Sequence, residues 1–216
     1  MEKIKKYGKW FLGSFIWIGI LVLGLDLLSK LLVVANKDYI QETGGIVLIP
    51  NFLRINYVIN NKVVFGIDLF KNDVANRAVF CVVALLISAG IIFYLIKKWD
   101  KTGKMMKGCL IAVVAGAIGN VIDRIFYTPE MLGYPNGVVD WIDFYGIWGF
   151  NFNIADAAVV VSAILLIIYM IVTDLIEYIH IHKKDKAESP KEDKKEEKVL
   201  SKTEREKNKY LENKDE

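Results

Sequence analysis

The sequence has few of the residues on which metal sites, disulfide frameworks and nucleophilic catalysis usually depend. It contains two histidines and two cysteines in 216 residues. Cys81 and Cys109 lie in apolar blocks without a CxxC spacing, and His180 and His182 flank the basic start of the C-terminal tail. These patterns indicate neither a metal cluster nor a Ser/His or Cys/His pair. We therefore expect no metal and no cofactor, and carboxylates are the remaining candidates for catalytic groups.

The net charge of the chain is also small. The formal net charge of +3 is too small to indicate a nucleic-acid partner. Residues 183–216 contain 12 Lys or Arg and 11 Asp or Glu but almost no apolar residues. Such a composition cannot bury a core, so we expect the chain to divide into a folded unit, 1–180, and a charged tail, 181–216. The tail is predicted to be disordered, or at most a solvated helix.

Long apolar runs are abundant, since 54% of the residues are hydrophobic. They fall into four blocks at 10–35, 74–96, 105–126 and 154–179. A run of about 18 or more apolar residues can cross the roughly 30 Å hydrocarbon core as a helix. The first block follows several lysines, as a signal peptide would, but it is longer and has no cleavage site. The sequence therefore predicts an α-helical integral membrane protein with four transmembrane helices.

The connections between these blocks differ in charge. Residues 97–104 are rich in lysine, whereas 36–73 and 127–152 are less basic. The positive-inside rule places both termini and 97–104 in the cytoplasm, and the other two connections outside. Residues 45–70 are rich in β-branched and aromatic residues, which predicts short strands in this outer connection. The aromatic segment 141–152 fits either a platform for a lipid-bearing substrate or plain anchoring at the membrane interface.

Asp26 and Lys30 are ionisable residues in the first predicted span, where charge is costly. Their spacing of four places them on one helical face, where they can form an ion pair. The alternative is a simple pair at the helix end, with Lys30 reaching the interface. A Ser29–Lys30 dyad is disfavoured because adjacent helical residues point about 100° apart.

The third predicted span ends with a second polar group. Asn120, Asp123 and Arg124 share one helical face and combine an amide, a carboxylate and a guanidinium. Gly116 and Gly119 would allow a neighbouring helix to approach closely. The group is either part of a functional site or a polar contact that locks the helices together.

Four aspartates, Asp123, Asp140, Asp143 and Asp156, are candidates for a catalytic pair. Two neighbouring carboxylates resist being charged together, so one can act as a general base while the other holds a proton. Asn153 is a candidate N-cap of the fourth span, and Asp156 in its first turn could serve capping alone. Asp140 lies in an apolar context without a local capping role. Spacing alone does not choose among the four.

At these residues the chain resembles the bacterial lipoprotein signal peptidases, or signal peptidase II. The resemblance covers roughly residues 10–180 and rests on five elements in order. They are Asp26-Leu-Leu-Ser-Lys30, Asn60 with Phe65-Gly66, Gly119-Asn-Val-Ile-Asp-Arg124, Val138-Val-Asp-Trp-Ile-Asp-Phe-Tyr145 and Phe152-Asn-Ile-Ala-Asp156. The resemblance implies a membrane enzyme of four transmembrane helices with a small extracytoplasmic β-rich cradle. It also implies that 1–180 is a membrane-embedded aspartic peptidase domain. It also implies cleavage of prolipoproteins on the N-terminal side of a diacylglyceryl-modified cysteine.

The resemblance also implies roles for individual residues, whereas residue reasoning alone would not have selected Asn60 from its probable turn. It assigns catalysis to Asp140 and Asp156. It places substrate-binding residues at Asn60, Asn120, Arg124 and Asn153, and supporting residues at Asp26, Lys30 and Asp123.

Further expectations follow from the same resemblance. The enzyme would be a monomer in the bacterial cytoplasmic membrane, in contact with membrane lipids, with its active site near the outer face. Globomycin-type cyclic peptides would inhibit it. The chain departs from the family pattern at Lys62-Val63-Val64 and in a longer 125–139 connection.

Two other functions are compatible with polar residues inside a membrane. Such residues also mark the pathways of ion- or proton-coupled transporters. The chain has no evident inverted repeat or broken-helix pattern, which counts against a transporter. A scaffold without catalytic activity, in which the polar residues only pack helices, is the other alternative.

Overall fold

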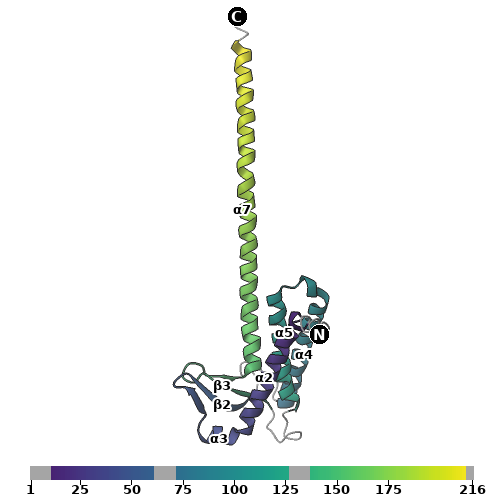
Figure 1. Ribbon diagram of the computed structural model, residues 1–216, viewed down its shortest axis with the longest axis vertical. Coiled ribbons are helices and arrows are strands. Elements are labelled where there is room, and N and C mark those ends of the chain that lie inside the picture. Colours follow the sequence, from purple (N-terminus) through teal and green to yellow (C-terminus); the bar gives the residue numbers. More distant parts are fainter. Residues whose placement is uncertain (1–10, 61–71, 127–136, 213–216) are drawn as a thin grey trace, which may run out of the picture. The chain divides into compact units, whose positions relative to one another are not determined.

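The computed structural model describes residues 11–60, 72–126 and 137–212. The departures from the family pattern at 62–64 and in most of the 125–139 connection therefore lie outside the described residues. Long helices and a small sheet make up the described chain (Figure 1). In chain order the elements are α2 (Ile16–Ala35), α3 (Lys37–Glu42), β1 (Ile46–Ile49), β2 (Leu53–Asn60), α4 (Asp73–Lys98), η2 (Trp99–Lys101), α5 (Lys104–Phe126), β3 (Val138–Asp143), β4 (Asn151–Phe152) and α7 (Ile154–Glu212).

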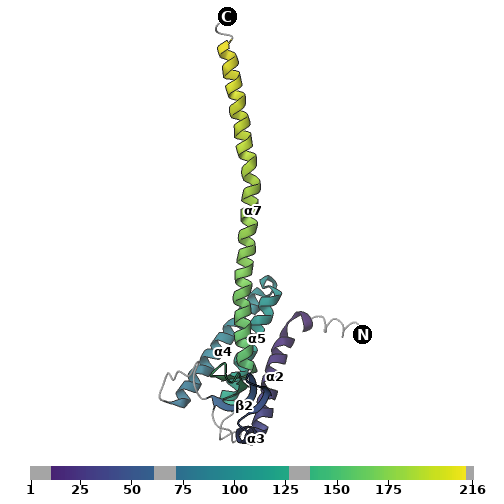
Figure 2. The same cartoon turned by 90° about the vertical axis from the view of Figure 1, so that its left-hand side faces the viewer.

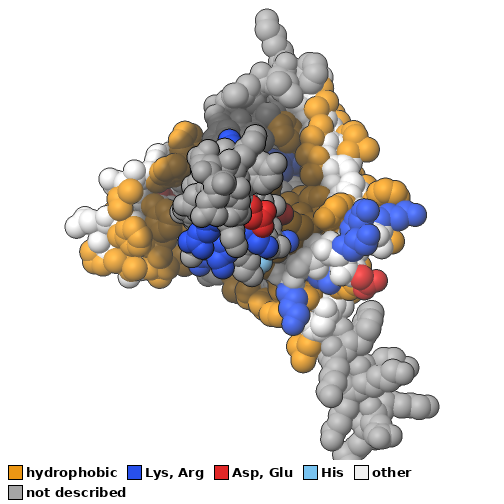
Figure 3. Space-filling model, turned by 90° about the horizontal axis from the view of Figure 1, so that it is seen from above, with side chains coloured by type: hydrophobic (Ala, Val, Ile, Leu, Met, Phe, Trp, Pro, Cys, Tyr) orange, Lys and Arg blue, Asp and Glu red, His pale blue; other side chains and the backbone are white. Residues whose placement is uncertain are grey.

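Within the described residues, four helical segments are long and apolar enough to cross a membrane: Ile16–Ala35, Val74–Lys101, Lys104–Phe126 and Ile154–Lys184. Many large apolar side chains on them are exposed, including Leu21, Leu86 and Ile167. Figure 3 shows hydrophobic side chains over much of the visible helix surface. Such a surface is stable when lipid covers it. The predicted α-helical membrane protein with four candidate spans is thus confirmed, together with its small antiparallel sheet.

The structure departs from the predicted elements at both ends of the first apolar block. Within the first block, α2 begins only at Ile16, because Phe15 adopts a left-handed conformation with φ of 58°. The Ser14 hydroxyl donates to the Phe11 carbonyl at 2.7 Å just before this break. The short helix α3 follows α2 almost directly and was not predicted, since six residues give little periodic signal.

The last helix crosses the boundary between two units, Met1–Leu166 and Ile167–Glu216. It continues through the charged tail to Glu212, so residues 181–212 are helical. Helix is one of the two forms that the tail composition allows, because Lys and Glu are good helix formers. The cytoplasmic location of the tail stays a prediction.

The sheet is antiparallel, with strand order β1-β2-β3-β4. It lies with α3 at the end of the spans opposite the connection between α4 and α5 (Figures 1 and 2). In the central pair, Ile59 lies opposite Val139 and Val58 opposite Asp140. The register shifts between Ile55 and Val58. The sheet therefore occupies the end of the bundle that the charge distribution predicts to be extracytoplasmic.

One face of the sheet packs on the end of α2 and on α3. Val33, Val34, Ile40 and Val139 form the buried cluster there. Neighbouring residues of a strand point to opposite faces. Because Val139 faces this cluster, the next residue, Asp140, faces away from it. The apolar cluster thus fixes the direction in which β3 presents its carboxylate.

Glycines allow close packing between α5 and its neighbours. A Cβ on Gly116 would lie 2.5 Å from the Ala155 carbonyl oxygen at the start of α7. A Cβ on Gly119 would lie 2.7 Å from Oδ2 of Asp26 in α2. The predicted close approach at Gly116 and Gly119 is confirmed, and it brings the polar ends of three helices together.

We expect Gly116→Ala to destabilise the protein, because the added methyl group meets a backbone oxygen that cannot rotate away. Overpacking of this kind costs about 1–3 kcal/mol. Gly90→Ala in α4 is the matched control, since a Cβ at Gly90 meets nothing within 4 Å. Unfolding of both purified variants in mixed detergent micelles measures the difference. Equal stability of the two variants would contradict the close packing at Gly116.

Candidate functional site

Polar side chains from five elements form one connected network where α2 and α5 end and α7 begins. They come from helices α2, α5 and α7 and from strands β2 and β3. All but one of the site residues that the sequence predicts belong to it: Asp26, Lys30, Asn60, Asn120, Asp123, Asp140, Asn153 and Asp156. The remaining one, Arg124, lies beside the network.

The ammonium group of Lys30 is the centre of this network and is fully buried, as 0% of its side chain is exposed. It lies 2.6 Å from Oδ2 of Asp26 and 2.8 Å from Oδ2 of Asp123. It also donates to Oδ1 of Asn120 at 3.1 Å. Three acceptors therefore satisfy its three N–H donors. The predicted ion pair of Asp26 with Lys30 is confirmed, but it is buried and includes a third residue, Asp123.

The two carboxylates that hold Lys30 also fix neighbouring backbone. Oδ1 of Asp26 accepts the Ala155 N–H at 2.8 Å, which satisfies one of the unpaired donors at the start of α7. Oδ2 of Asp123 accepts the Val139 N–H at 3.3 Å. The ion pairs thereby position both α7 and β3 against α2 and α5.

Asn153 and Asp156 form a reciprocal cap at the start of α7. Oδ1 of Asn153 accepts the Asp156 N–H at 2.9 Å, and Oδ2 of Asp156 accepts the Asn153 N–H at 3.2 Å. This is the geometry of a capping box. The predicted N-cap role of Asn153 is confirmed, and Asp156 is held in one orientation.

Two side-chain amides connect Asp156 to Asp140. The amide nitrogen of Asn120 donates to Oδ1 of Asp156 at 2.7 Å. The amide nitrogen of Asn153 donates to Oδ1 of Asp140 at 2.8 Å and to Oδ1 of Asn120 at 3.1 Å. Amides donate hydrogen bonds without adding charge. Asp140 and Asp156 thus lie around the same pair of amides, and among the described residues no cation forms an ion pair with either.

Asn60 completes the surroundings of Asp140. Its amide nitrogen donates to Oδ2 of Asp140 at 2.9 Å. It is two residues from Val58, which lies opposite Asp140 in the register of β2 and β3, so it lies on the same face of the sheet. Strand register depends on contacts distant in sequence. Residue reasoning therefore missed Asn60, and only the motif resemblance indicated it.

The carboxyl group of Asp140 is buried, with 2% of the residue exposed. Burial raises its pKa from 3.8 to about 7, and the nearby charge of Asp156 acts in the same direction. The hydrogen bonds from Asn60 and Asn153 oppose this rise in the pKa. At neutral pH Asp140 thus exists in both protonation states, as a proton donor or acceptor requires.

The other two candidate aspartates each have a cation as partner. Asp123 is bound to Lys30, as described above. Asp143 lies 2.6 Å from Nε of Arg54, which is opposite it in the sheet. The sequence analysis did not single out Arg54, since its pairing also depends on strand register. Geometry therefore separates Asp140 and Asp156 from their two rivals, although spacing in the sequence did not.

Arg124 lies at the edge of the network. Its Nη1 donates to the Asn120 carbonyl at 3.1 Å within its own helix, and its guanidinium lies 5.5 Å from the centre of the Phe80 ring. It is close enough to Asp156 for an electrostatic interaction. In the described parts of the chain, no group of three or more His, Cys, Asp or Glu residues is arranged to hold a metal ion.

Most of this chain is similar to known proteins. The family model for signal peptidase (SPase) II matches residues 18–172. A lipoprotein signal peptidase of Clostridioides difficile (strain 630) is 38% identical over 158 residues, which are 73% of this chain and 94% of the relative. One from Treponema pallidum (strain Nichols) is 37% identical over 157 residues, which are 70% of this chain and 79% of the relative.

Two solved structures are also similar to this chain. A bacterial membrane enzyme determined by the in meso method at 2.3 Å is 30% identical, with a TM-score of 0.56, and the match covers 74% of this chain and 89% of that one. A second such structure, at 1.9 Å, has a TM-score of 0.54 with 30% identity, and covers 74% of this chain and 94% of that one. The similarity extends over the segment that contains the polar network.

We expect Lys30→Met to be strongly destabilising, because it leaves two buried carboxylates without their cation. Breaking a buried ion pair by removing one partner costs about 3–5 kcal/mol. Lys101→Met, at an exposed lysine, is the matched control. The free energy of unfolding in mixed micelles measures both. A loss for Lys30→Met as small as that of the control would contradict the central role of Lys30.

The high pKa of Asp140 predicts a pH dependence of stability. The folded protein holds the Asp140 proton up to about pH 7, whereas the unfolded chain releases it near pH 4. The stabilisation is therefore present at low pH and is lost as the pH rises through this window. We expect the wild type to lose stability relative to Asp140→Asn between about pH 4 and 7. Melting temperatures in detergent across this range test this, and parallel curves would contradict it.

Proposed function

The chain belongs to the signal peptidase II family, and we propose that it hydrolyses prolipoproteins as an aspartic peptidase whose catalytic pair is Asp140 and Asp156. Its relatives are lipoprotein signal peptidases, and the chain is a multi-pass membrane protease of that kind. The aspartic mechanism, the cleavage site and the residue roles are the proposal. The cleaved bond lies on the N-terminal side of a cysteine that carries diacylglyceryl.

One observation carries the choice of the pair. Asp140 and Asp156 are joined through the amides of Asn120 and Asn153, and no cation of the described part of the chain forms an ion pair with either. A pair of carboxylates without a cation shares a proton more readily than carboxylates bound to Lys or Arg, which stay ionised. Asp123 and Asp143 are of the second kind. Two carboxylates with one shared proton are the arrangement that metal-free peptide hydrolysis needs.

We assign the base to Asp156 and the acid to Asp140. The first turn of a helix favours a negative charge, which suits an ionised Asp156. The raised pKa of Asp140 suits a proton donor. Asp156 removes a proton from water while the water oxygen attacks the scissile carbonyl carbon, and Asp140 gives its proton to the carbonyl oxygen. When the C–N bond breaks, the proton on Asp156 passes to the leaving amine and Asp140 recovers its own from the hydroxyl.

The neighbouring polar residues position this pair and the substrate. Asn60, Asn120 and Asn153 orient the carboxylates through the hydrogen bonds described above, and their amides border the space in which a peptide would bind. Arg124 would hold a carbonyl of the substrate backbone, a task that suits the guanidinium. The remaining predicted residues support the site through the buried ion pairs that position α7 and β3, and they are Asp26, Lys30 and Asp123.

The location of the site suits a substrate that is itself anchored in the membrane. The network lies where three spans meet the sheet, so a scissile bond just outside the lipid acyl chains would reach it. Exposed apolar side chains at Ile147, Trp148 and Phe150 provide a surface that tolerates lipid. We place this end outside the bacterial cytoplasmic membrane and both termini in the cytoplasm. The enzyme acts as a monomer among membrane lipids.

Substitution of the two aspartates tests the assignment. We expect Asp140→Asn and Asp156→Asn each to reduce turnover by at least about 10³-fold, because an amide neither removes nor supplies the proton. Asp143→Asn is the matched control, since this aspartate is also buried in β3 but bound to Arg54. Cleavage of a diacylglyceryl-modified prolipoprotein by the purified variants is followed by gel shift.

Several outcomes of this assay would contradict the proposal. Full activity of either Asn variant would exclude that aspartate, and loss of activity only in Asp143→Asn would select a different pair. Inhibition of the wild type by a globomycin-type cyclic peptide is expected. A protein that never cleaves but drives ion flux in liposomes would instead be a transporter, and one with neither activity a scaffold.

A further inference from the structure

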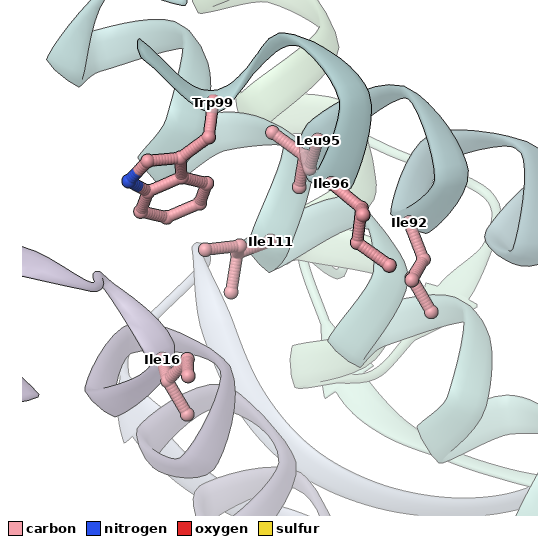
Figure 4. A pocket seen from close by; sticks show the side chains of 6 residues that line it. All are labelled: Ile16, Ile92, Leu95, Ile96, Trp99 and Ile111. Atoms are coloured by element: carbon pink, nitrogen blue, oxygen red, sulfur yellow. The ribbon is translucent and has the colours of Figure 1, made fainter.

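An apolar depression that is open on one side, called the cavity below, lies at the end of the spans away from the sheet. Its volume is about 370 Å³. It is lined by side chains from α2, α4, η2 and α5, namely Ile16, Ile92, Leu95, Ile96, Trp99 and Ile111 (Figure 4). The volume is within the range of small-molecule sites. Its lining is entirely hydrophobic, so an occupant would offer an apolar chain.

This cavity is separate from the polar network. Ile16 is the first residue of α2 and precedes Asp26 by ten residues, which is about 15 Å along a helix. Ile111 precedes Asn120 by nine residues in α5, which is about 13 Å. No residue that lines the cavity contributes to the proposed catalytic site.

Lysines surround the turn that borders the cavity. Lys97, Lys98, Lys101, Lys104 and Lys107 lie in or beside η2, where Asp100 is the one acidic residue among 97–107. The turn thus carries a local net charge of +4, from five lysines and one aspartate.

One of these lysines contacts a residue that lines the cavity, and a second is on the same side of its helix. Nζ of Lys107 lies 4.4 Å from the centre of the Trp99 ring, and Trp99 lines the cavity. Lys107 and Lys104 precede Ile111 by four and seven residues in α5, so they lie on the same side of the helix, toward its charged end. The apolar lining therefore continues directly into a positively charged rim.

We propose that this cavity binds one anionic phospholipid, with an acyl chain among the six apolar side chains and the phosphate at Lys104 and Lys107. The apolar cavity matches the acyl chain of such a lipid, and the adjacent positively charged rim matches its phosphate. Basic pockets between transmembrane helices bind anionic head groups, and each lysine near the surface adds to the attraction. The head group of a zwitterionic lipid also carries a positive charge, which the lysines repel. Such a lipid therefore gains less binding free energy at this rim. This proposal goes beyond the proposed peptidase activity and does not depend on it.

Native mass spectrometry of the full chain in detergent tests the lipid site. The protein is titrated with dioleoylphosphatidylglycerol or dioleoylphosphatidylcholine, which have the same acyl chains and differ in head-group charge. We expect one phosphatidylglycerol to bind about tenfold or more tightly than phosphatidylcholine. Equal affinity for the two lipids would overturn the proposal.

The charged rim is tested with a matched pair of double variants. Lys104→Gln with Lys107→Gln is expected to remove the preference for phosphatidylglycerol. Lys202→Gln with Lys207→Gln makes the same change in net charge at exposed lysines of the tail and is expected to keep it. An equal loss in both double variants would show unspecific charge attraction and overturn the site.

The binding of the acyl chain in the cavity is tested separately. Ile92→Trp fills the cavity from α4, and Leu86→Trp places the same side chain elsewhere on the exposed surface of that helix. Both positions are exposed, so both variants should fold. We expect Ile92→Trp to weaken phosphatidylglycerol binding about tenfold and Leu86→Trp to leave it unchanged. Phosphatidylglycerol binding that is unaffected by Ile92→Trp would overturn the proposed place of the acyl chain.

Discussion

A fully buried ammonium group imposes the main constraint on this structure. Lys30 cannot stay charged away from water unless acceptors surround it, and Asp26, Asp123 and Asn120 provide them. The same two carboxylates accept N–H groups from Ala155 and Val139. Satisfying one charge therefore connects two spans, the start of a third and the central strand of the sheet. The catalytic residues that we propose lie on the elements held in this way.

Neutral side-chain amides are the hydrogen-bond partners of the two proposed catalytic aspartates, and this choice of partner affects how readily the carboxylates ionise. Three amides, those of Asn60, Asn120 and Asn153, hold Asp140 and Asp156 in place, with no cation from residues 11–60, 72–126 or 137–212 in an ion pair with them. A lysine or arginine in their positions would favour the ionised form of both carboxylates. With amides, burial and mutual repulsion dominate, and the pKa of Asp140 rises to about 7. Asp143 in the same strand is bound to Arg54 instead. Strand β3 therefore carries one aspartate with amide partners and one with a cation as partner.

Features that depend on short stretches of sequence were predictable. The four spans follow from the length of the apolar runs, and the cap formed by Asn153 and Asp156 from a spacing of three. Features that depend on distant partners were not. The break at Phe15, the short helix α3 and the hydrogen bond from Asn60 to Asp140 leave no strong local pattern. The family resemblance supplied Asn60, which residue reasoning did not.

The sequence by itself determined that the chain spans a membrane four times, that its candidate catalytic groups are carboxylates, and that polar residues gather at the ends of the spans. These properties follow from composition and helical spacing, which are local. Residue patterns alone did not separate the four aspartates; the family resemblance selected two of them, and the tertiary structure gives the physical difference. Asp123 meets Lys30 across two helices, and Asp143 meets Arg54 across two strands. Asp140 and Asp156 meet amides instead. The protonation of a carboxylate depends on its neighbours in space, and those neighbours are distant in the chain.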